Sequence, residues 1–381
     1  MESLCSCSPF VRGFLPGILI GLFSSVLLFN TIWKEPPLTT ERQISWWSSS
    51  RLPLHHNPPM QLSDHREAEL IPIARKLRAS DNEDDCNPSV YLRTQYLDQS
   101  SYLLVVLVHS TPRASGTRGA IRASWLTNRR SQTRYLARFV IGTKNLTPKD
   151  AQALACENKQ YGDLVMLPDD ADTVNPQEWS STSKLLGSFR WAMDNVKFSY
   201  ILKCTDSTFA VIDTIVKELE FREQKNNKTT DFLWGFFAGG VQAGKEGRLS
   251  EKNWFLCSHF LPFPQGGGYV ISHSLVELLL SLAEELQHYE HDDIGLGAWI
   301  SPFNNIEKYH DVRFNTGYYS RGCQNVYIVS HMETGSSMQR KYSSLVQTGQ
   351  VCQQEFMSRL SYVYNWTAPA NRCCVRTPNI P

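Results

Sequence analysis

The pattern of apolar and polar positions changes twice along the chain. An uncharged, strongly apolar run extends from Gly13 to Trp33, and a polar, proline-rich stretch follows it to about residue 98. Beyond that point, short apolar runs of strand length alternate with longer segments of helical period. This order predicts an anchor, a connecting stem and one α/β domain.

The apolar runs of the last part have the composition of strands buried on both faces. The first, at 102–109, reads Tyr-Leu-Leu-Val-Val-Leu-Val-His, and the others are 138–142, 163–167, 198–202 and 232–237. The intervening segments predict helices at 117–125, 184–196, 211–222 and 275–286. Strands that alternate with helices favour a mostly parallel sheet, whose ligand sites lie beyond the carboxyl ends of its strands.

The run from Gly13 to Trp33 is flanked by Arg12 and Lys34. As a helix it would rise roughly 32 Å, which is enough to cross the hydrocarbon core of a bilayer. A cleaved signal peptide and a buried core helix are the alternatives, but the run is long for a signal peptide and no small-residue cleavage motif follows it. We expect a single-pass type II protein with a cytoplasmic tail at 1–12, a transmembrane signal anchor at 13–33, a lumenal stem at 34–98 and the globular domain at 99–381.

Composition narrows the class of protein only modestly. Lys+Arg 38 against Asp+Glu 37 leaves a net charge of +1, so no bulk charge points to nucleic acid. Eight cysteines follow the anchor without CxxC spacing, which makes a zinc site improbable and favours disulfides of unreadable pairing. Glycosylation sequons begin at Asn145, Asn227 and Asn365 and would be used only in the secretory pathway.

Four short segments carry the chemistry-bearing residues. A glycine run at 266–268 would let the backbone approach a ligand at the mouth of a strand. Asp292 and Asp293 stand at a predicted helix start, where they would either act on a ligand or merely cap the helix. The strand at 198–202 leads into Lys203-Cys-Thr-Asp-Ser207, and a third apolar run ends on His331, a position that is otherwise more often structural.

These segments resemble blocks of the inverting beta-1,3-glycosyltransferases of glycosyltransferase family 31. Segment 118–125, Arg-Gly-Ala-Ile-Arg-Ala-Ser-Trp, is similar to that family's Arg-x-x-(Ile/Val)-Arg-x-(Thr/Ser)-Trp block, and four further blocks follow in order at 139–143, 161–163, 266–270 and 292–297. The carboxyl-terminal segments 319–323, 359–364, 366–369 and 373–374 are similar to the galactosyltransferase II branch, which acts on the proteoglycan linker region.

The resemblance implies a GT-A (Rossmann-like) fold, a UDP-sugar donor, a glycan acceptor, manganese and residence in the Golgi membrane. It implies that Asp293 is the general base, which removes the proton of the acceptor hydroxyl. It places the nucleotide sugar against Arg118, Arg122, Lys203, Asp206, Gly267, Gly268 and Asp292, and the metal against Asp206, Ser207 and His331.

The metal segment departs from the family. Where relatives have three consecutive aspartates, this chain has Thr205, Asp206 and Ser207, so the last acid, normally the direct metal ligand, is a serine. A hydroxyl can ligate a hard cation, and this predicts weakened manganese binding. Basic side chains at Lys203, Arg118 and Arg122 offer another way to neutralise the diphosphate. Of the family's acceptor-side block only Thr182 and Lys184 remain.

Two functions of different class follow. The first is an active UDP-hexose transferase, with galactose as the sugar implied by the resemblance, acting on glycoprotein or proteoglycan linker glycans. The second is a non-catalytic relative that binds glycan or assists a partner transferase. Asp293 and the glycine run favour the first function, and Thr205 and Ser207 favour the second.

The anchor at 13–33 makes a direct prediction about fractionation. Because an uncharged run long enough to cross a bilayer precedes the stem, the full-length protein should stay in the membrane pellet after alkaline carbonate extraction. Its amino terminus should remain uncleaved. Release into the supernatant, or processing near residue 33, would contradict the anchor.

Overall fold

The structure is a computed structural model that describes residues 86–92, 98–127, 133–168, 170, 181–225, 231–244, 246, 249–378 and 380–381. The predicted tail, the anchor at 13–33, most of the stem and Asn227 lie outside these residues. Among the described residues, no helix is long and apolar enough to cross a membrane.

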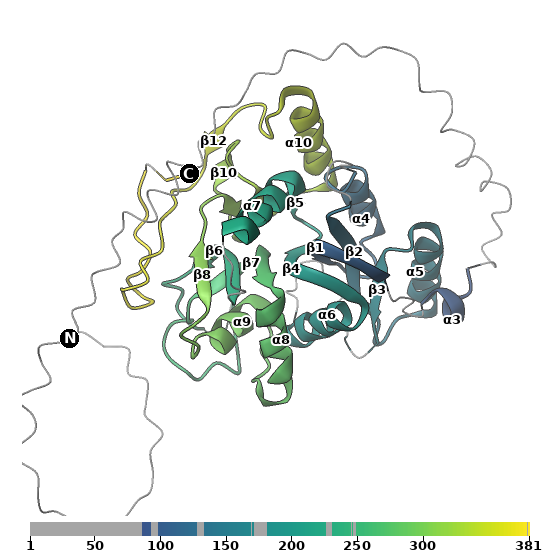
Figure 1. Cartoon of the computed structure of the whole chain (residues 1–381), viewed down its shortest axis with the longest axis horizontal. Coiled ribbons are helices and arrows are strands. Elements are labelled where there is room, and N and C mark those ends of the chain that lie inside the picture. Colours follow the sequence, from purple (N-terminus) through teal and green to yellow (C-terminus); the bar gives the residue numbers. More distant parts are fainter. Residues whose placement is uncertain are drawn as a thin grey trace, which may run out of the picture. The chain divides into compact units, whose positions relative to one another are not determined.

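A seven-stranded sheet forms the centre of the domain (Figure 1). Its strand order is β3-β2-β1-β4-β7-β6-β8, with β1, β2, β3 and β4 parallel and β7 antiparallel to both of its neighbours. The strands are β1 (Asp98–His109), β2 (Tyr135–Gly142), β3 (Leu164–Leu167), β4 (Val196–Thr205), β6 (Phe232–Ala238), β7 (Phe263–Ser272) and β8 (Glu307–His310). The mixed α/β class and the parallel part of the sheet are confirmed.

Several helices begin at residues whose side chains cap them. Thr147 and Pro148 start α5 (Pro148–Tyr161), and Gly162 ends it in the left-handed conformation. Ser181 caps α6 (Thr182–Asn195), and Ser272 caps α8 (His273–Ser281). The remaining helices are α3 (Pro88–Tyr91), α4 (Ser115–Arg122), α7 (Ile212–Lys225), η2 (Ala283–Glu285), α9 (Asp292–Ile300) and α10 (Gly335–Thr348).

Helices pack on both faces of the sheet. On one face α6 contacts β1 and β4, and α8 and α9 pack against β7 and against α6. On the other face α7 packs against β1, and α10 contacts α4 (Figure 1). The strands between these two helix layers are buried on both sides, which explains why β1 reads as an unbroken apolar run.

Two small sheets build the region around the end of β4. β11 (Val329–Ser330) lies between β5 (Phe209–Ala210) and β9 (Phe314–Asn315). β10 (Gly322–Cys323) pairs with β12 (Phe356–Met357). Because β5 follows the 205–208 turn and β11 precedes His331, the three-stranded sheet brings the predicted metal segment and that histidine to the same side of the domain.

The glycine run lies inside β7 instead of at the mouth of a strand. A Cβ on Gly267 would lie 2.5 Å from the Thr316 carbonyl oxygen and 2.6 Å from Cγ of His331. A Cβ on Gly268 would lie 2.9 Å from a methyl group of Val329. Glycine is therefore required here by the close approach of other segments of the chain, a reason that the sequence pattern did not reveal.

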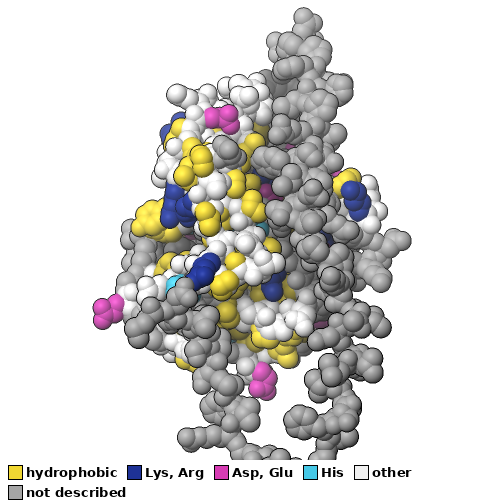
Figure 2. Space-filling view, turned by 90° about the vertical axis from the view of Figure 1, so that its left-hand side faces the viewer, with side chains coloured by type: hydrophobic (Ala, Val, Ile, Leu, Met, Phe, Trp, Pro, Cys, Tyr) yellow, Lys and Arg dark blue, Asp and Glu magenta, His cyan; other side chains and the backbone are white. Residues whose placement is uncertain are grey.

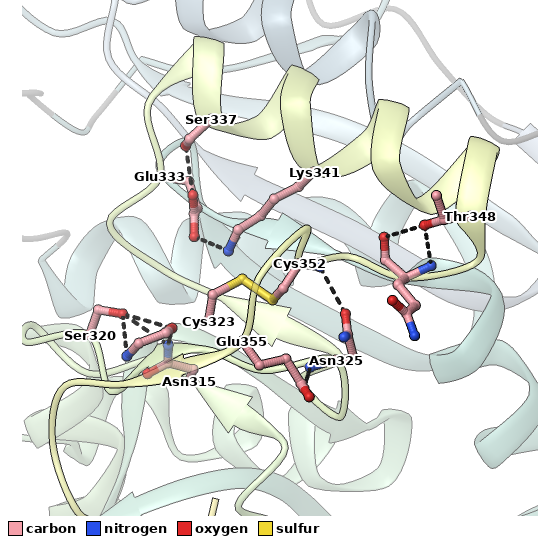
Figure 3. The surroundings of a disulfide bond; sticks show 12 residues. Asn315, Ser320, Cys323, Asn325, Glu333, Ser337, Lys341, Thr348, Cys352 and Glu355 are labelled. Atoms are coloured by element: carbon pink, nitrogen blue, oxygen red, sulfur yellow. Dashed lines mark hydrogen bonds and ion pairs between the residues drawn. A yellow bond between two sulfur atoms is a disulfide. The ribbon is translucent and has the colours of Figure 1, made fainter.

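Six of the eight cysteines after the anchor form disulfides. Cys86 pairs with Cys156, Cys323 with Cys352 and Cys373 with its neighbour Cys374, whereas Cys204 and Cys257 form no disulfide. The Cys323–Cys352 bond lies below α10 (Figure 3), where the Cys352 backbone N–H donates to Asn325 at 2.8 Å. The expectation of disulfides holds for six cysteines and fails for two.

The described surface mixes apolar and charged side chains. On the face in Figure 2, hydrophobic side chains are interspersed with a few charged ones and do not form a uniform patch. Several large apolar residues are exposed near the carboxyl end, among them Tyr319, Phe356 and Val375. Scattered exposure of this kind is usual for a globular protein and identifies no partner.

The disulfides make a testable prediction about stability. Replacing Cys323 and Cys352 by serine should lower the free energy of unfolding by about 3–4 kcal/mol, because the bond closes a chain segment of 29 residues. Replacing Cys373 and Cys374 by serine is the matched control, since that bond closes almost no chain and should cost much less. Urea unfolding of the three proteins gives the comparison. Equal losses in the two variants would contradict the chain-closure argument.

Candidate active site

Asp292 and Asp293 occupy the first turn of α9, as the sequence predicted. Every residue of this helix is buried, so both carboxylates are held away from bulk water. Gly297 allows α9 to lie directly on β7, because a Cβ there would be 2.5 Å from Cβ of Phe263. The helix start is thereby fixed beside the glycine run.

A buried lysine neutralises the first of the two acids. Nζ of Lys203, in β4, lies 2.5 Å from Oδ2 of Asp292, and both side chains are about 1% exposed. Nζ also donates to the Gly266 carbonyl oxygen at 3.2 Å. Lys203 and Asp292, which we expected to contact the nucleotide sugar, are therefore paired with each other and tie β4 to α9. A buried charge is tolerated only with such a partner.

His109 adjoins this pair without adding a positive charge. Its Nδ1 lies 3.9 Å from Oδ2 of Asp292, and its Nε2 is 3.1 Å from Oγ of Ser188. Burial, followed by the charges of Lys203 and Lys184, lowers the pKa of His109 well below its usual value. The imidazole is therefore neutral at physiological pH, and Lys203 is the cation that balances Asp292.

Asp293 has the environment of a proton acceptor. Its Oδ2 accepts a hydrogen bond from the Gly266 backbone N–H at 2.9 Å, and its Oδ1 accepts one from Ile294 at 2.8 Å. Burial, and then the charge of Asp292, raise its pKa to about 6, against the opposing effects of His291, Lys203 and the Gly266 N–H. A carboxylate of this strength is ionised at neutral pH and is a better base than an ordinary aspartate.

The predicted metal segment begins at Thr205, the last residue of β4. Oδ2 of Asp206 accepts a hydrogen bond from Oγ of Ser110 at 2.7 Å. Oγ of Ser207 lies 3.1 Å from Oγ1 of Thr205, so these two neutral side chains bond to each other in place of two carboxylates. Within the described part of the chain, no group of three or more His, Cys, Asp or Glu side chains could hold a metal ion.

His331 is buried beside the same segment. The Glu333 backbone N–H donates to the Ser207 carbonyl oxygen at 2.9 Å and so holds the His331 loop next to the turn. Nδ1 of His331 lies 3.4 Å from the Gly317 carbonyl oxygen, and burial lowers the pKa of the ring to about 4. A neutral imidazole, one carboxylate and one hydroxyl are a sparse set of ligands. Because two of these three groups are neutral, they would hold a divalent cation only weakly.

Arg118 has no exposed surface with which to meet a nucleotide sugar. Its guanidinium makes two hydrogen bonds with Glu157, at 2.7 and 2.5 Å, and donates to the Thr111 carbonyl oxygen at 2.6 Å. It also donates to Oγ of Ser110 at 2.9 Å, the hydroxyl that in turn donates to Asp206. Arg118 is therefore connected to Asp206 only indirectly, through the Ser110 hydroxyl.

Arg122 is committed to other partners. It donates to both carboxylate oxygens of Asp163 at 2.8 Å and to Glu157, and it stacks over the ring of Tyr161. Since Lys203 is also paired, none of the three cations that we expected to neutralise the diphosphate is available without breaking a buried or half-buried ion pair.

The two remnants of the acceptor-side block face inward. Nζ of Lys184 donates to the Ser110 carbonyl oxygen at 2.8 Å. Oγ1 of Thr182 donates to the Tyr289 carbonyl oxygen at 3.0 Å and accepts from the Tyr289 N–H at 2.9 Å. Both residues therefore connect α6 to neighbouring loops around the site. Of the sequons, Asn145 and Asn365 are exposed.

Sequence reasoning missed three buried residues of this region. The hydroxyls of Tyr269 and Thr316 are buried without a hydrogen-bond partner among the described residues. Glu251 is fully buried and accepts hydrogen bonds from the backbone just before Asp292. Tyr269 lies within the 266–270 block of the family resemblance, but no role was predicted for its side chain. Nothing in the local pattern marks Thr316 or Glu251.

Comparison with known proteins identifies the family. Residues 116–310 match the galactosyltransferase family. The chain is 39% identical over 280 residues to beta-1,3-galactosyltransferase 6 of Mus musculus, covering 73% of this chain and 84% of that protein. It is 29% identical over 160 residues to UDP-GalNAc:beta-1,3-N-acetylgalactosaminyltransferase 2 of Danio rerio, covering 42% of this chain and 30% of that one.

Among solved structures, a mannosyltransferase from Pyrobaculum calidifontis matches at 11% identity with a TM-score of 0.32, covering 59% of this chain and 60% of that one. At that score the likeness carries no argument about the site. The match over half of the chain and the 39% identical relative show that the chain belongs to the galactosyltransferase family. It is a hexosyltransferase, and homologues support a beta-1,3-glycosyltransferase.

Proposed function

We propose that the protein is an inverting beta-1,3-galactosyltransferase of the galactosyltransferase II type, with a GT-A domain held in the Golgi membrane by residues 13–33. Its donor would be UDP-galactose and its acceptor a glycoprotein or proteoglycan linker glycan. The observation that carries the proposal is Asp293, a buried carboxylate with its pKa raised to about 6, at the start of α9 and against the Gly266 N–H.

The reaction needs one base and one way to stabilise a leaving diphosphate. The oxygen of an acceptor hydroxyl attacks the anomeric carbon of the sugar, and its proton passes to a carboxylate oxygen of Asp293. The bond from the anomeric carbon to the diphosphate oxygen breaks in the same step, and UDP leaves with the electron pair. Attack from the opposite face inverts the configuration, and such a base contributes about 10²–10⁴-fold to the rate.

The residues around Asp293 prepare it for this role. The Lys203–Asp292 pair holds the start of α9 against β4, and the Gly266 N–H orients one oxygen of the base. Manganese would be held by Asp206, Ser207 and His331, and when bound it would supply positive charge to the leaving diphosphate. The serine makes this a weak site, since it offers a neutral oxygen where relatives have a carboxylate.

Substitution of the base tests the function directly. Asp293→Asn should lower turnover by roughly two orders of magnitude or more, with little change in UDP affinity, because the amide cannot accept the proton. In the unmodified protein, kcat/KM should fall as the pH drops through about 6, because Asp293 becomes protonated there. Transfer from UDP-galactose is measured across pH 5–8. Unchanged turnover in the Asn variant would refute the assignment.

Restoring the missing carboxylate tests the metal site. Ser207→Asp should tighten manganese binding in the presence of UDP by roughly 10–100-fold, because a charged oxygen replaces a hydroxyl beside Asp206 and His331. Ser207→Asn, similar in size but neutral, is the control and should show no such gain. Calorimetric titration of UDP with and without manganese gives the comparison. Tight manganese-dependent UDP binding by the unmodified protein would contradict the prediction.

A further inference from the structure

We propose that Glu251 is a positioning residue for the transfer reaction, because its carboxylate fixes the backbone turn that delivers Asp293 to the acceptor hydroxyl. The inference rests on the proposed function, in which Asp293 is the base. Glu251 is 0% exposed and comes from the segment between β6 and β7, far in sequence from the turn before α9 that it contacts.

The contacts of Glu251 converge on two consecutive residues. The Glu290 N–H donates to its two carboxylate oxygens at 3.1 and 2.9 Å, and the His291 N–H donates to Oε2 at 3.1 Å. Nδ1 of His291 lies 3.4 Å from the same oxygen. We call these contacts the Glu251 clamp. They end one residue before Asp292 and two before Asp293.

The start of α9 needs an external partner of this kind. His291 is the N-cap residue of α9, and its side chain makes no capping hydrogen bond to the helix. Buried backbone N–H groups without acceptors are costly, at about 1–3 kcal/mol each. The Glu251 clamp satisfies the two N–H groups that precede the helix, and its negative charge lies at the amino end of the helix, where the helix dipole favours it.

The opposite side of the same turn is held by α6. Oγ1 of Thr182 bonds both the N–H and the carbonyl group of Tyr289, and a Cβ on Gly295 would lie 2.3 Å from Cγ2 of Thr182. Trp254, three residues after Glu251, packs against Tyr289 with the two rings tilted and their centroids 5.8 Å apart. The turn at 289–291 is therefore fixed between Thr182 and Glu251, and Asp293 has little freedom to move.

Position matters because the base must reach one particular proton. A displacement of about 1 Å from productive geometry can cost on the order of 10²-fold in rate. The groups that face Asp293 are Asp292 and His291 on its own segment, Lys203 on β4, and Tyr269 and the Gly266 N–H on β7. The Gly266 hydrogen bond lowers the pKa of Asp293, so losing this alignment should raise it.

The test compares four substitutions in the full-length protein, with UDP-galactose as donor and 4-nitrophenyl β-galactoside as acceptor. Glu251→Ala should lower kcat roughly 30–100-fold, while UDP binds with unchanged stoichiometry and with affinity within about threefold. Glu251→Gln should recover part of the loss, because its amide oxygen still accepts a hydrogen bond. Glu290→Ala, which removes an exposed carboxylate from the same turn, should leave kcat unchanged.

The pH profile separates positioning from a general loss of structure. In Glu251→Ala the acidic limb of kcat/KM should move to higher pH, because Asp293 loses the Gly266 N–H. If kcat and UDP stoichiometry fall in parallel with no shift of this limb, Glu251 is only structural and the inference is overturned. Should the alanine variant not fold, Glu251→Gln carries the same test, and a kcat within threefold of the unmodified protein overturns the inference.

The fourth substitution, Asp293→Asn, separates the inference from the function on which it rests. If Asp293→Asn keeps its turnover, the proposed base is wrong, whatever the Glu251 variants do. If Asp293→Asn is inactive and both Glu251 variants keep full turnover, the function stands and the Glu251 clamp does not position the base.

Discussion

The site depends on one electrostatic constraint, the burial of two adjacent carboxylates at the start of α9. Two negative charges side by side and away from water repel each other and lose their hydration, so they persist only where the surroundings compensate them. Lys203 neutralises Asp292, and the Gly266 N–H supports Asp293. Burial, and then the remaining repulsion from Asp292, raise the pKa of Asp293 to about 6. The same constraint that makes the site costly to build thus produces its base.

The need to compensate these two buried carboxylates determines how the neighbouring elements pack. Lys203 must come from β4, the backbone amide from β7 and the acids from α9, so these elements meet without room for additional side-chain atoms. Gly297 lets α9 lie on β7, and Gly267 lets the His331 loop approach the same strand from its other side. The fully buried Arg118 adds a second charged centre, which reaches Asp206 through Ser110. The Lys203–Asp292 pair and the Arg118–Glu157 pair therefore fix the ends of β1 and β4.

Much of the fold could be predicted from the sequence, because buried parallel strands appear as unbroken apolar runs and helices show their period and caps. The 102–109 run became β1, and the acids were placed correctly at a helix start. The antiparallel insertion of β7 was missed, since neighbour order in a sheet depends on contacts between distant segments. For the same reason sequence spacing gave no sign of Glu251. The family resemblance implied that Arg118 and Arg122 face a ligand, whereas in the structure they form ion pairs with Glu157 and Asp163.

The Cys323–Cys352 bond makes the segment between these residues a covalently closed ring. That ring contains His331 and all of α10, including Val346, which is 67% exposed. A protease that cuts the backbone in α10 would leave both fragments joined through sulfur, and the cut chain would run as one molecule on a non-reducing gel and as two after reduction. The His331 loop would also keep the hydrogen bond from the Glu333 N–H to the Ser207 carbonyl oxygen, which lies outside the ring. A gel run without reductant would therefore be a poor guide to whether this region has been nicked.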